Sequence, residues 1–189
     1  RQSVDREVKT TRESVGICDV STIGKIDVQG ADAAAFLNKI YCNGFAKLDV
    51  GKTRYGLMLR EDGIAVDDGT AARFAEDHFV VTTTTANALS VYRHMEFVRQ
   101  VLSPDMDVQL ISTTESWAQY AVAGPNARNL LRKIVDAEFD ISNEAFPFMA
   151  CGAITVCGGL RARLFRISFS GELAYEIAVP TRYGDAMIR

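Results

Sequence analysis

The sequence predicts an α+β fold made of antiparallel sheets, and three observations support this prediction. Strand-like segments are short and numerous, helical segments are few, and neighbouring strands are separated by turn residues instead of helical crossovers. The turn at Glu61-Asp62-Gly63, for example, joins two strands as a hairpin. Because strands joined by tight turns run in opposite directions, we expect antiparallel sheets and not a doubly wound parallel one.

Two short strands and a helix are expected near the start of the chain. Residues 1–14 are polar and are expected to be helical or loose, and residues 15–20 and 24–28 have the composition of strands. Gly30-Ala31-Asp32 then opens a helix. The apolar stripe of this helix consists of Ala35, Phe36, Leu37 and Ile40.

The strongest helical pattern spans residues 87–102, where apolar side chains recur at helical spacing. Three strands precede it, at 54–59, 64–71 and 79–83, and one follows it at 108–111. The apolar positions of the helix are Leu89, Val91, Tyr92, Met95, Val98 and Leu102.

The last third of the chain repeats the alternation of strands and turns. Strands are expected at 120–123, 154–156, 163–169 and 174–180, and a helix begins at Gly124-Pro125-Asn126, since proline is well tolerated where a helix starts. The buried side of this helix is expected to carry Leu130, Leu131 and Ile134.

Composition excludes several classes of protein. The formal charge of −3 disfavours nucleic-acid binding, which needs a basic surface. No apolar run approaches the roughly 20 residues that span a bilayer, and the first segment has no apolar stretch typical of a signal peptide. We therefore expect a cytoplasmic protein. Because the chain lacks an initiator methionine and stops soon after a strand, we also expect it to be part of a longer polypeptide.

The four cysteines show no spacing typical of a zinc site. Cys18, Cys42, Cys151 and Cys157 form no CxxC pair, and the two histidines stand apart from them. No metal site is predicted. The thiols are expected to be free and buried, which is typical of a reducing compartment.

A carboxylate in the last strand is the most distinctive feature of the sequence. If residues alternate faces there, Tyr175 lies with Ile177 and Val179, and Glu176 lies with two alanines on the opposite face. A buried carboxylate without a donor is unfavourable. Its donor is either an internal arginine, for which Arg166 is the candidate, or a ligand.

The acid pair Asp67-Asp68 is a second candidate site. Strand alternation places Asp68 on the face of Ile64 and Val66, where burial would raise the pKa of its carboxyl group and suit it to proton transfer. Alternatively, the pair ends the strand and caps the turn before Gly69.

The run Thr82-Thr83-Thr84-Thr85 lies directly before the long helix. Hydroxyl groups there cap the helix or, alternatively, hold a polar heterocycle or an anion. No GxGxxG or P-loop spacing occurs, and neither histidine has a neighbouring nucleophile, so nucleotide binding by those motifs and a Ser/Cys–His hydrolase are disfavoured.

An ordered set of motifs identifies a family resemblance. The chain resembles the folate-binding domain of the aminomethyltransferase (glycine-cleavage T-protein) family, from about Arg12 almost to its end. The resemblance implies interleaved subdomains, 12–52 with 113–150 and 53–112 with 151–189, with ferredoxin-like and barrel-like portions. The motifs are Gly16–Ser21, Gly30–Asp32 with Phe36-Leu37, Gly63–Asp68, Ala123–Pro125, Arg166, Gly171-Glu172 and Tyr175–Ile177.

Within the family, other segments are similar to the α subunits of heterotetrameric sarcosine oxidases. That resemblance implies partner subunits, with NAD, FAD and FMN bound elsewhere in the complex, and tetrahydrofolate and an imine as small-molecule partners. The segments are Gly24–Val28, Arg54–Met58, the threonine run, Ala145–Met149 and Arg166–Leu173.

The resemblance also implies roles for individual residues. Asp68 matches the acidic residue beside the reactive nitrogens of tetrahydrofolate, and Glu176 matches the carboxylate that binds the pterin. Arg166 and Glu172 belong to the same motif and are expected to support its loop as an internal pair. The implied folate-binding residues are Glu176, Tyr55, Thr82, Thr83, Thr84, Arg166 and Glu172, with Asp68 catalytic.

The implied activity is transfer of the one-carbon unit of a sarcosine-derived imine to tetrahydrofolate, giving 5,10-methylenetetrahydrofolate and glycine. Two alternatives remain open: a non-catalytic folate-binding or subunit-docking module, and aminomethyl transfer like that of dimethylglycine dehydrogenase. A tRNA-modifying relative of the same fold is disfavoured, because its hallmark residues are absent and the chain is acidic.

Overall fold

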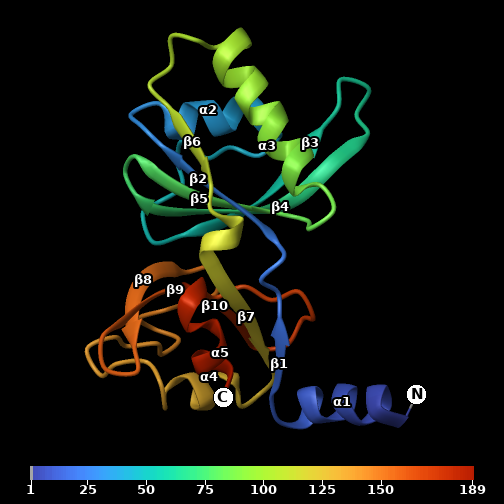
Figure 1. Ribbon diagram of the computed structural model, residues 1–189, viewed down its shortest axis with the longest axis vertical. Helices are drawn as coiled ribbons and strands as arrows, with labels where there is room; N and C mark the ends of the chain where they lie inside the picture. The colour runs from blue at the N-terminus through green and yellow to red at the C-terminus, as the bar shows by residue number, and fades with distance from the viewer. Residues whose placement is uncertain (1) are drawn as a thin grey trace. The chain divides into compact units, whose positions relative to one another are not determined.

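Two compact units make up the chain. The computed structural model describes residues 2–189. Unit 1 comprises the N-terminal segment up to Ser21 together with Ser116–Arg189, and unit 2 comprises Thr22–Glu115. Each unit contains one five-stranded sheet in which every pair of strands is antiparallel, and helices accompany each sheet. The predicted α+β class with antiparallel sheets is therefore confirmed (Figure 1).

The units do not coincide with the ranges suggested on sequence grounds. Those ranges separated residues 12–52 from 53–112, whereas the strand at 24–29 hydrogen-bonds to the strands at 78–83 and 109–112 within one sheet. This pairing holds the whole of Thr22–Glu115 together as one unit.

The sheet of unit 2 has the strand order β3-β4-β5-β2-β6. The predicted strands are present, although β4 extends well past its predicted end. The Arg60–Gly63 turn closes the β3–β4 hairpin, and Gly63 has a positive φ of 83°, which suits glycine. The strands are β2 (Gly24–Gln29), β3 (Thr53–Leu59), β4 (Ala65–Ala75), β5 (His78–Thr83) and β6 (Gln109–Ser112).

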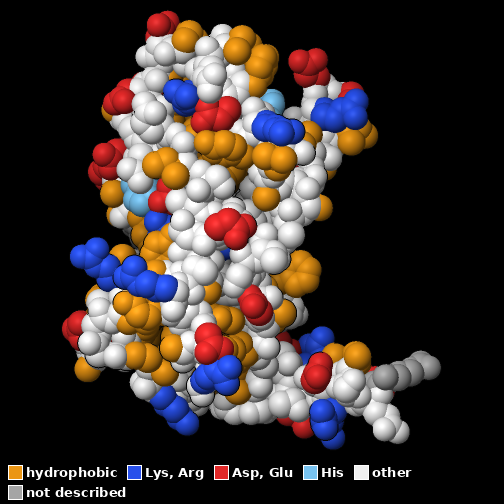
Figure 2. Space-filling model, in the orientation of Figure 1, with side chains coloured by type: hydrophobic (Ala, Val, Ile, Leu, Met, Phe, Trp, Pro, Cys, Tyr) orange, Lys and Arg blue, Asp and Glu red, His pale blue; other side chains and the backbone are white. Residues whose placement is uncertain are grey.

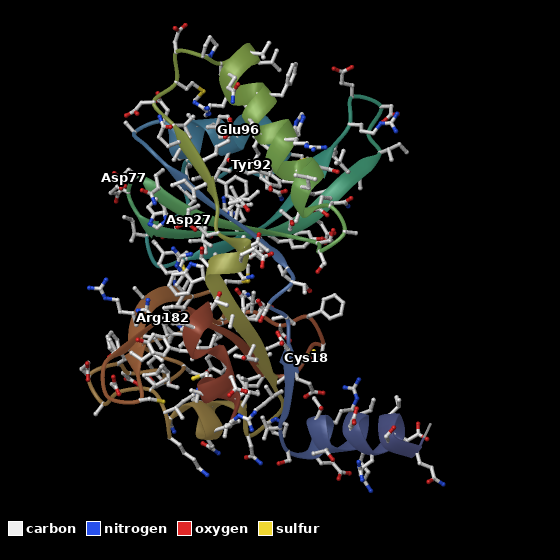
Figure 3. All side chains as sticks on the ribbon, in the orientation of Figure 1. Cys18, Asp27, Asp77, Tyr92, Glu96 and Arg182 are labelled. Atoms are coloured by element: carbon white, nitrogen blue, oxygen red, sulfur yellow. The ribbon has the colours of Figure 1, made fainter. Side chains whose placement is uncertain are left out.

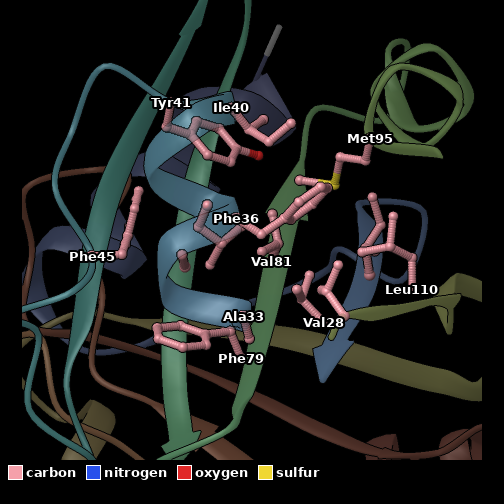
Figure 4. Packing of buried hydrophobic residues seen from close by; sticks show 14 of the residues in the cluster. Val28, Ala33, Phe36, Ile40, Tyr41, Phe45, Phe79, Val81, Met95 and Leu110 are labelled. Carbon is pink, nitrogen blue, oxygen red and sulfur yellow. The ribbon is translucent and has the colours of Figure 1, made fainter. Parts of the chain in front are cut away.

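Two helices, α2 (Ala33–Ile40) and α3 (Ala88–Phe97), cover one face of this sheet (Figure 1). Phe36 and Leu37 of α2 are fully buried against Val28, Phe79 and other strand residues of that face (Figure 4). The buried stripe of α2 contains Ala33 and not Ala35, which is exposed.

The helix predicted at 87–102 changes type near its end. After α3, residues Val98–Leu102 form a π-helix, η1, in which Ser103 N donates to Val98 O. Within α3, Tyr92 and Glu96 lie one turn apart (Figure 3), and the Tyr92 hydroxyl donates to the Glu96 carboxylate at 3.2 Å. Hydrophobic side chains gather at the surface over α3 and η1 (Figure 2), and the exposed ones are Leu89, Phe97, Val101 and Leu102.

The sheet of unit 1 has the strand order β1-β7-β10-β9-β8. Helices α4 (Ala127–Leu131) and α5 (Gly184–Ile188) pack on one face of it, while α1 (Gln2–Glu13) contributes no buried residue. The single-turn helices η2 (Thr114–Ser116) and η3 (Thr181–Tyr183) flank β7 and β10. The strands are β1 (Gly16–Asp19), β7 (Trp117–Ala123), β8 (Cys151–Val156), β9 (Leu160–Phe165) and β10 (Ala174–Pro180).

Two sequence predictions for unit 1 need correction. The strand predicted at 163–169 ends at Phe165, and the next residue, Arg166, still bonds through its backbone N–H to the carbonyl of Ala150. The four cysteines are free as predicted, but only Cys151 is buried. Cys18 lies on β1, a strand bonded on one side only, which accounts for its exposure (Figure 3).

Among residues 2–189, no helix is both long and apolar enough to cross a membrane.

Replacing Phe36 by alanine tests the core of unit 2. Because the Phe36 side chain is fully buried, Phe36→Ala should lower the free energy of unfolding by about 3–5 kcal/mol. Urea denaturation followed by circular dichroism measures the change. The matched control is Phe97→Ala, whose side chain is 50% exposed, and it should change stability far less. Equal losses for the two variants would contradict this packing.

Candidate functional site

The two adjacent acids of β4 point to opposite faces of the sheet, and the acid on the buried face is not the one that the sequence predicted. Asp67 pairs with Met58 of the core face and is only 6% exposed, while Asp68 pairs with Leu57 and is half-buried. The acid that the helices cover is therefore Asp67 and not Asp68.

A β-bulge explains the difference. Met58 pairs with Asp67 and Leu59 pairs with Ala65, so Val66 is an extra residue without a partner on β3. Val66 packs against the core beside Asp67, whereas regular alternation would have placed Val66 on the face of Asp68. The bulge therefore turns Asp68 toward the sheet face that carries no helix.

On that face, Asp68 is bonded to Tyr55. The Tyr55 hydroxyl donates to Asp68 Oδ2 across the β3–β4 pair, and the Tyr55 side chain is 49% exposed. This hydrogen bond raises the pKa of the Tyr55 phenol, and burial and the negative charges of Asp68 and Asp67 act in the same direction. Asp68 is thus an oriented, partly solvated carboxylate with an exposed hydroxyl beside it.

Asp67 accepts three hydrogen bonds from the segment that leads into α3. Thr84 N donates to Oδ2 at 3.1 Å, Thr84 Oγ1 donates to Oδ1 at 2.6 Å, and Asn87 Nδ2 donates to Oδ1 at 3.1 Å. Its charge also raises the pKa of Tyr41, although burial is the larger cause. Asp67 therefore joins β4 to the start of the helix.

The threonine run divides between the two faces of the sheet. Thr82 lies on the face of Asp68, where its hydroxyl contacts Thr70, while Thr83 pairs with Gly24 and is buried. None of the threonines caps α3: the residue at the N-cap is Asn87, which makes no side-chain capping bond. The capping interpretation of the run is therefore wrong.

Glu176 occupies the predicted face of β10. Tyr175, Ile177 and Val179 are buried in the core beneath α4 and α5, and Glu176 lies on the opposite face with Ala174 and Ala178. The side-chain amide of Gln119, from the neighbouring strand β7, donates to Glu176 Oε2. Glu176 is thus held by a neutral donor of the adjacent strand, among other contacts.

Arg166 lies on the other side of this sheet from Glu176. Its guanidinium is 5.8 Å from the ring centre of Tyr175, which is a core residue, and Nη1 donates to the carbonyl of Phe146 at 2.8 Å. Arg166 Nε is buried and, among the described residues, has no hydrogen-bond partner. Arg166 therefore supports the loop before β10.

The predicted internal pair of Arg166 and Glu172 is wrong. Glu172 instead forms an ion pair with Arg12 at the end of α1, with 2.7 Å between Arg12 Nη1 and Glu172 Oε1. The two residues are 160 positions apart, so no local pattern in the sequence indicates that they meet.

The structure thus brings part of the predicted set together. In unit 2, Tyr55, Asp68 and Thr82 share the helix-free face of one sheet, while Thr83 faces the helices. In unit 1, Glu176 occupies the helix-free face, and Arg166 and Glu172 do not accompany it.

Three further residues are notable: Gln119 and Phe169 were not singled out from the sequence, and Asp67 was named only as a member of the acid pair. Asp67 accepts hydrogen bonds that join β4 to the start of α3, and Gln119 donates to Glu176. Phe169 is fully exposed in the loop that precedes β10. The threonine run followed by Asn87 is the sequence feature that could have indicated hydrogen bonds to Asp67. No sequence feature indicated a role for Gln119 or Phe169. No cluster of metal-ligating side chains occurs within residues 2–189.

A shallow hollow of about 450 Å³ lies elsewhere in unit 2. Leu59, Val66 and His94 line it together with the residues of the hairpin turn, Arg60, Glu61 and Asp62. None of the predicted site residues borders this hollow.

Comparisons with known proteins agree on one family. The model of the GCVT N-terminal domain matches residues 1–189. The chain is 58% identical over 188 residues to sarcosine oxidase subunit alpha of Rhizobium meliloti (strain 1021), covering 99% of the chain and 19% of that protein. It is 32% identical to the aminomethyltransferase of Chloroherpeton thalassium, covering 95% of the chain and 47% of that protein.

A solved structure shows the same fold. The glycine cleavage system aminomethyltransferase T from Bartonella henselae matches with a TM-score of 0.82 at 26% identity, covering 97% of this chain and 46% of that one. The chain therefore spans about a fifth of the sarcosine oxidase subunit and about half of the aminomethyltransferases it matches.

The ionisation of Tyr55 tests the Tyr55–Asp68 contact. Asp68→Asn removes the charged acceptor, so the pKa of the Tyr55 phenol should fall toward the ordinary value of about 10. NMR titration of ring-labelled tyrosine, assigned with Tyr55→Phe, measures it. Asp62→Asn, an exposed acid of the hairpin turn, is the control and should leave the titration unchanged. An unaltered pKa in Asp68→Asn would contradict the contact.

Proposed function

Because the chain belongs to the GCVT N-terminal domain family, we propose that it is a folate-binding domain that transfers a one-carbon unit to tetrahydrofolate. The observation that carries the proposal is the placement of Asp68. It is oriented by Tyr55 on a sheet face without helices, at the position where the family resemblance expects an acid beside the reactive nitrogens.

The residues present suit a reduced folate. A pterin offers an amino group and ring N–H groups, and a carboxylate such as Glu176 accepts from such donors in charge-assisted bonds. Phe169 offers an exposed aromatic face of the kind that stacks on a heterocycle. We propose that Glu176 of unit 1 holds the pterin, and that Tyr55 and Thr82 of unit 2 are polar groups on the sheet face of Asp68.

Arg166 and Glu172 take an indirect part in this proposal. Arg166 bonds to Phe146 and Glu172 to Arg12, so both fix the segment between β9 and β10 that carries Phe169. Arg166 and Glu172 would thus contribute to folate binding indirectly, by holding this segment and its Phe169 side chain in place.

Asp68 has two roles in the proposed transfer. Its negative charge stabilises the positive charge that develops as the one-carbon unit leaves its amine, and its carboxylate accepts the proton lost by the attacking nitrogen. The folate supplies that nucleophilic nitrogen. Two carbon–nitrogen bonds to the folate form, one from each of its reacting nitrogens, while both bonds of the carbon–nitrogen double bond to the departing glycine break. The two protons lost by the folate nitrogens pass to the glycine nitrogen. Tyr55 keeps the Asp68 carboxylate oriented throughout.

The name of the 58% identical relative, sarcosine oxidase subunit alpha, supports a proposal for the source of the one-carbon unit. We propose that the imine formed by oxidising sarcosine is the donor. The oxidation itself, with NAD, FAD and FMN, would belong to other parts of a complex in which this chain works beside further subunits. The same site also suits aminomethyl transfer from dimethylglycine-derived imines.

Asp68→Asn in the complete protein tests the proposed catalytic role. Losing a positioned proton acceptor should lower the folate-dependent yield of methylenetetrahydrofolate about 10²- to 10⁴-fold, with sarcosine oxidation itself unaffected. Product analysis by chromatography measures this, and Asp62→Asn is the control. An unchanged yield would remove the catalytic role and favour a binding module instead.

Glu176→Gln tests the proposed pterin contact. A hydrogen bond to a charged group contributes about 1.5–3 kcal/mol, so the affinity for tetrahydrofolate should fall by roughly 10- to 100-fold. Calorimetry on the complete protein measures the affinity. Glu138→Gln, an acid that accepts a hydrogen bond from the Thr155 hydroxyl, is the control. Full affinity in Glu176→Gln would contradict pterin binding by this residue.

A further inference from the structure

We propose that Asp67, which no sequence argument assigned a role, is a positioning residue that fixes the backbone of Asp68. The inference rests on the proposed function for its catalytic meaning. Its structural basis is the way in which β4 and β5 are joined next to the two acids.

The backbone pairing between β4 and β5 stops short of the acid pair. It runs from Ala75 and His78 to Ala71 and Val81, and no further backbone partners follow. Residues 65–69 of β4 have register partners on β3 alone. The bonds that join Asp67 and Val66 to the segment before α3 involve side chains.

The first side-chain attachment near the acid pair is Thr82. Its hydroxyl accepts a hydrogen bond from Thr70 N at 3.0 Å and lies 2.9 Å from the Thr70 hydroxyl. The carbonyl of Thr82 lies so close to Gly69 that a Cβ at that position would meet it at 1.9 Å. Glycine is thus required where the two strands approach each other without a backbone ladder.

The second attachment is Asp67, and it lies at the end of the stretch. Its carboxylate accepts from Thr84 N, Thr84 Oγ1 and Asn87 Nδ2, and Asn87 also donates to the carbonyl of Val66 at 3.0 Å. All three groups that face Asp67 are donors, and the carboxylate is 6% exposed. A charged acceptor suits this position better than any neutral side chain.

Asp68 follows directly in the chain and points to the opposite face, toward Tyr55. On the β3 side its backbone is fixed by the pair Leu57–Asp68, and on the β5 side the nearest attachments are those of Asp67 and Thr82. Without the hydrogen bonds of Asp67, this part of β4 would lose its attachment to the segment before α3. The Asp68 carboxylate would then lose its fixed position relative to Tyr55.

Asp67→Asn is the main test variant. Asparagine keeps the shape but presents an N–H₂ group to a donor, so at least one of the three bonds is lost. The first measurement is independent of folate: the pKa of the Tyr55 phenol should fall, because the bond from Tyr55 to Asp68 loosens. Loss of the Asp67 charge lowers this pKa as well, so Asn87→Ala, which keeps that charge, is the deciding variant. An unchanged Tyr55 titration in Asn87→Ala overturns the inference.

The second measurement is a double-mutant cycle on folate-dependent turnover in the complete protein. Misplacement of a reacting group by about 1 Å lowers rates up to roughly 100-fold, so Asp67→Asn should reduce kcat about 10- to 100-fold with little change in folate affinity. If Asp67 acts through Asp68, the double variant should be no slower than Asp68→Asn alone. Losses that multiply overturn the inference, because they would indicate independent roles.

Two further variants distinguish a loss of positioning from a loss of folding. Asn87→Ala removes one donor to Asp67 and the bond to Val66, and should lower the Tyr55 pKa and kcat in the same direction but less. If Asp67→Asn does not fold, Asn87→Ala decides. Thr85→Ala is the matched control, since the Thr85 hydroxyl bonds to the Thr22 hydroxyl and not to the acid pair within residues 2–189, so it should change neither quantity.

The measurements separate this inference from the proposed function. If Asp68→Asn leaves folate-dependent turnover intact, the proposed function fails, while the Tyr55 titration of Asn87→Ala still shows whether Asp67 positions Asp68. If Asp68→Asn is slow but Asp67→Asn keeps full kcat, the inference fails and the proposed function stands.

Discussion

Each of the two sheets buries one face beneath its own helices, and this constraint determines where polar groups of the candidate site can lie. Side chains alternate along a strand, so every residue that packs under a helix sends its neighbour to the opposite face. Tyr175 and Ile177 enter the core of unit 1 and thereby direct Glu176 to the helix-free face. In unit 2, Met58 enters the core and directs its neighbour Leu57, the pairing partner of Asp68, to the helix-free face.

The departures from this regularity are concentrated at the acid pair. A bulge at Val66 changes which acid is buried, and Gly69 permits a close approach of β4 and β5 just beyond the last residues that are paired between them. An irregular strand needs other attachments, and Asp67 supplies one from its buried carboxylate. The same geometry leaves Asp68 oriented by Tyr55 and partly open to solvent.

Much of the fold and part of the site could be predicted from local patterns. The faces of β10 followed from the alternation of Tyr175, Ile177 and Val179, because that strand is regular along its length. The face of Asp68 did not follow, because a bulge depends on the partner strand and leaves no mark in the sequence of β4 alone. The partner of Glu172 was missed because Arg12 lies far away in the chain.

The sequence by itself determined the α+β class, the family resemblance and the residue types that suit folate chemistry, since these depend on periodicity and on ordered motifs. Only the tertiary structure decided that Asp67 is buried and Asp68 is presented, that Arg166 lies across the sheet from Glu176, and that Gln119 bonds to Glu176. These outcomes depend on strand register and on contacts between distant segments, which local propensity does not encode.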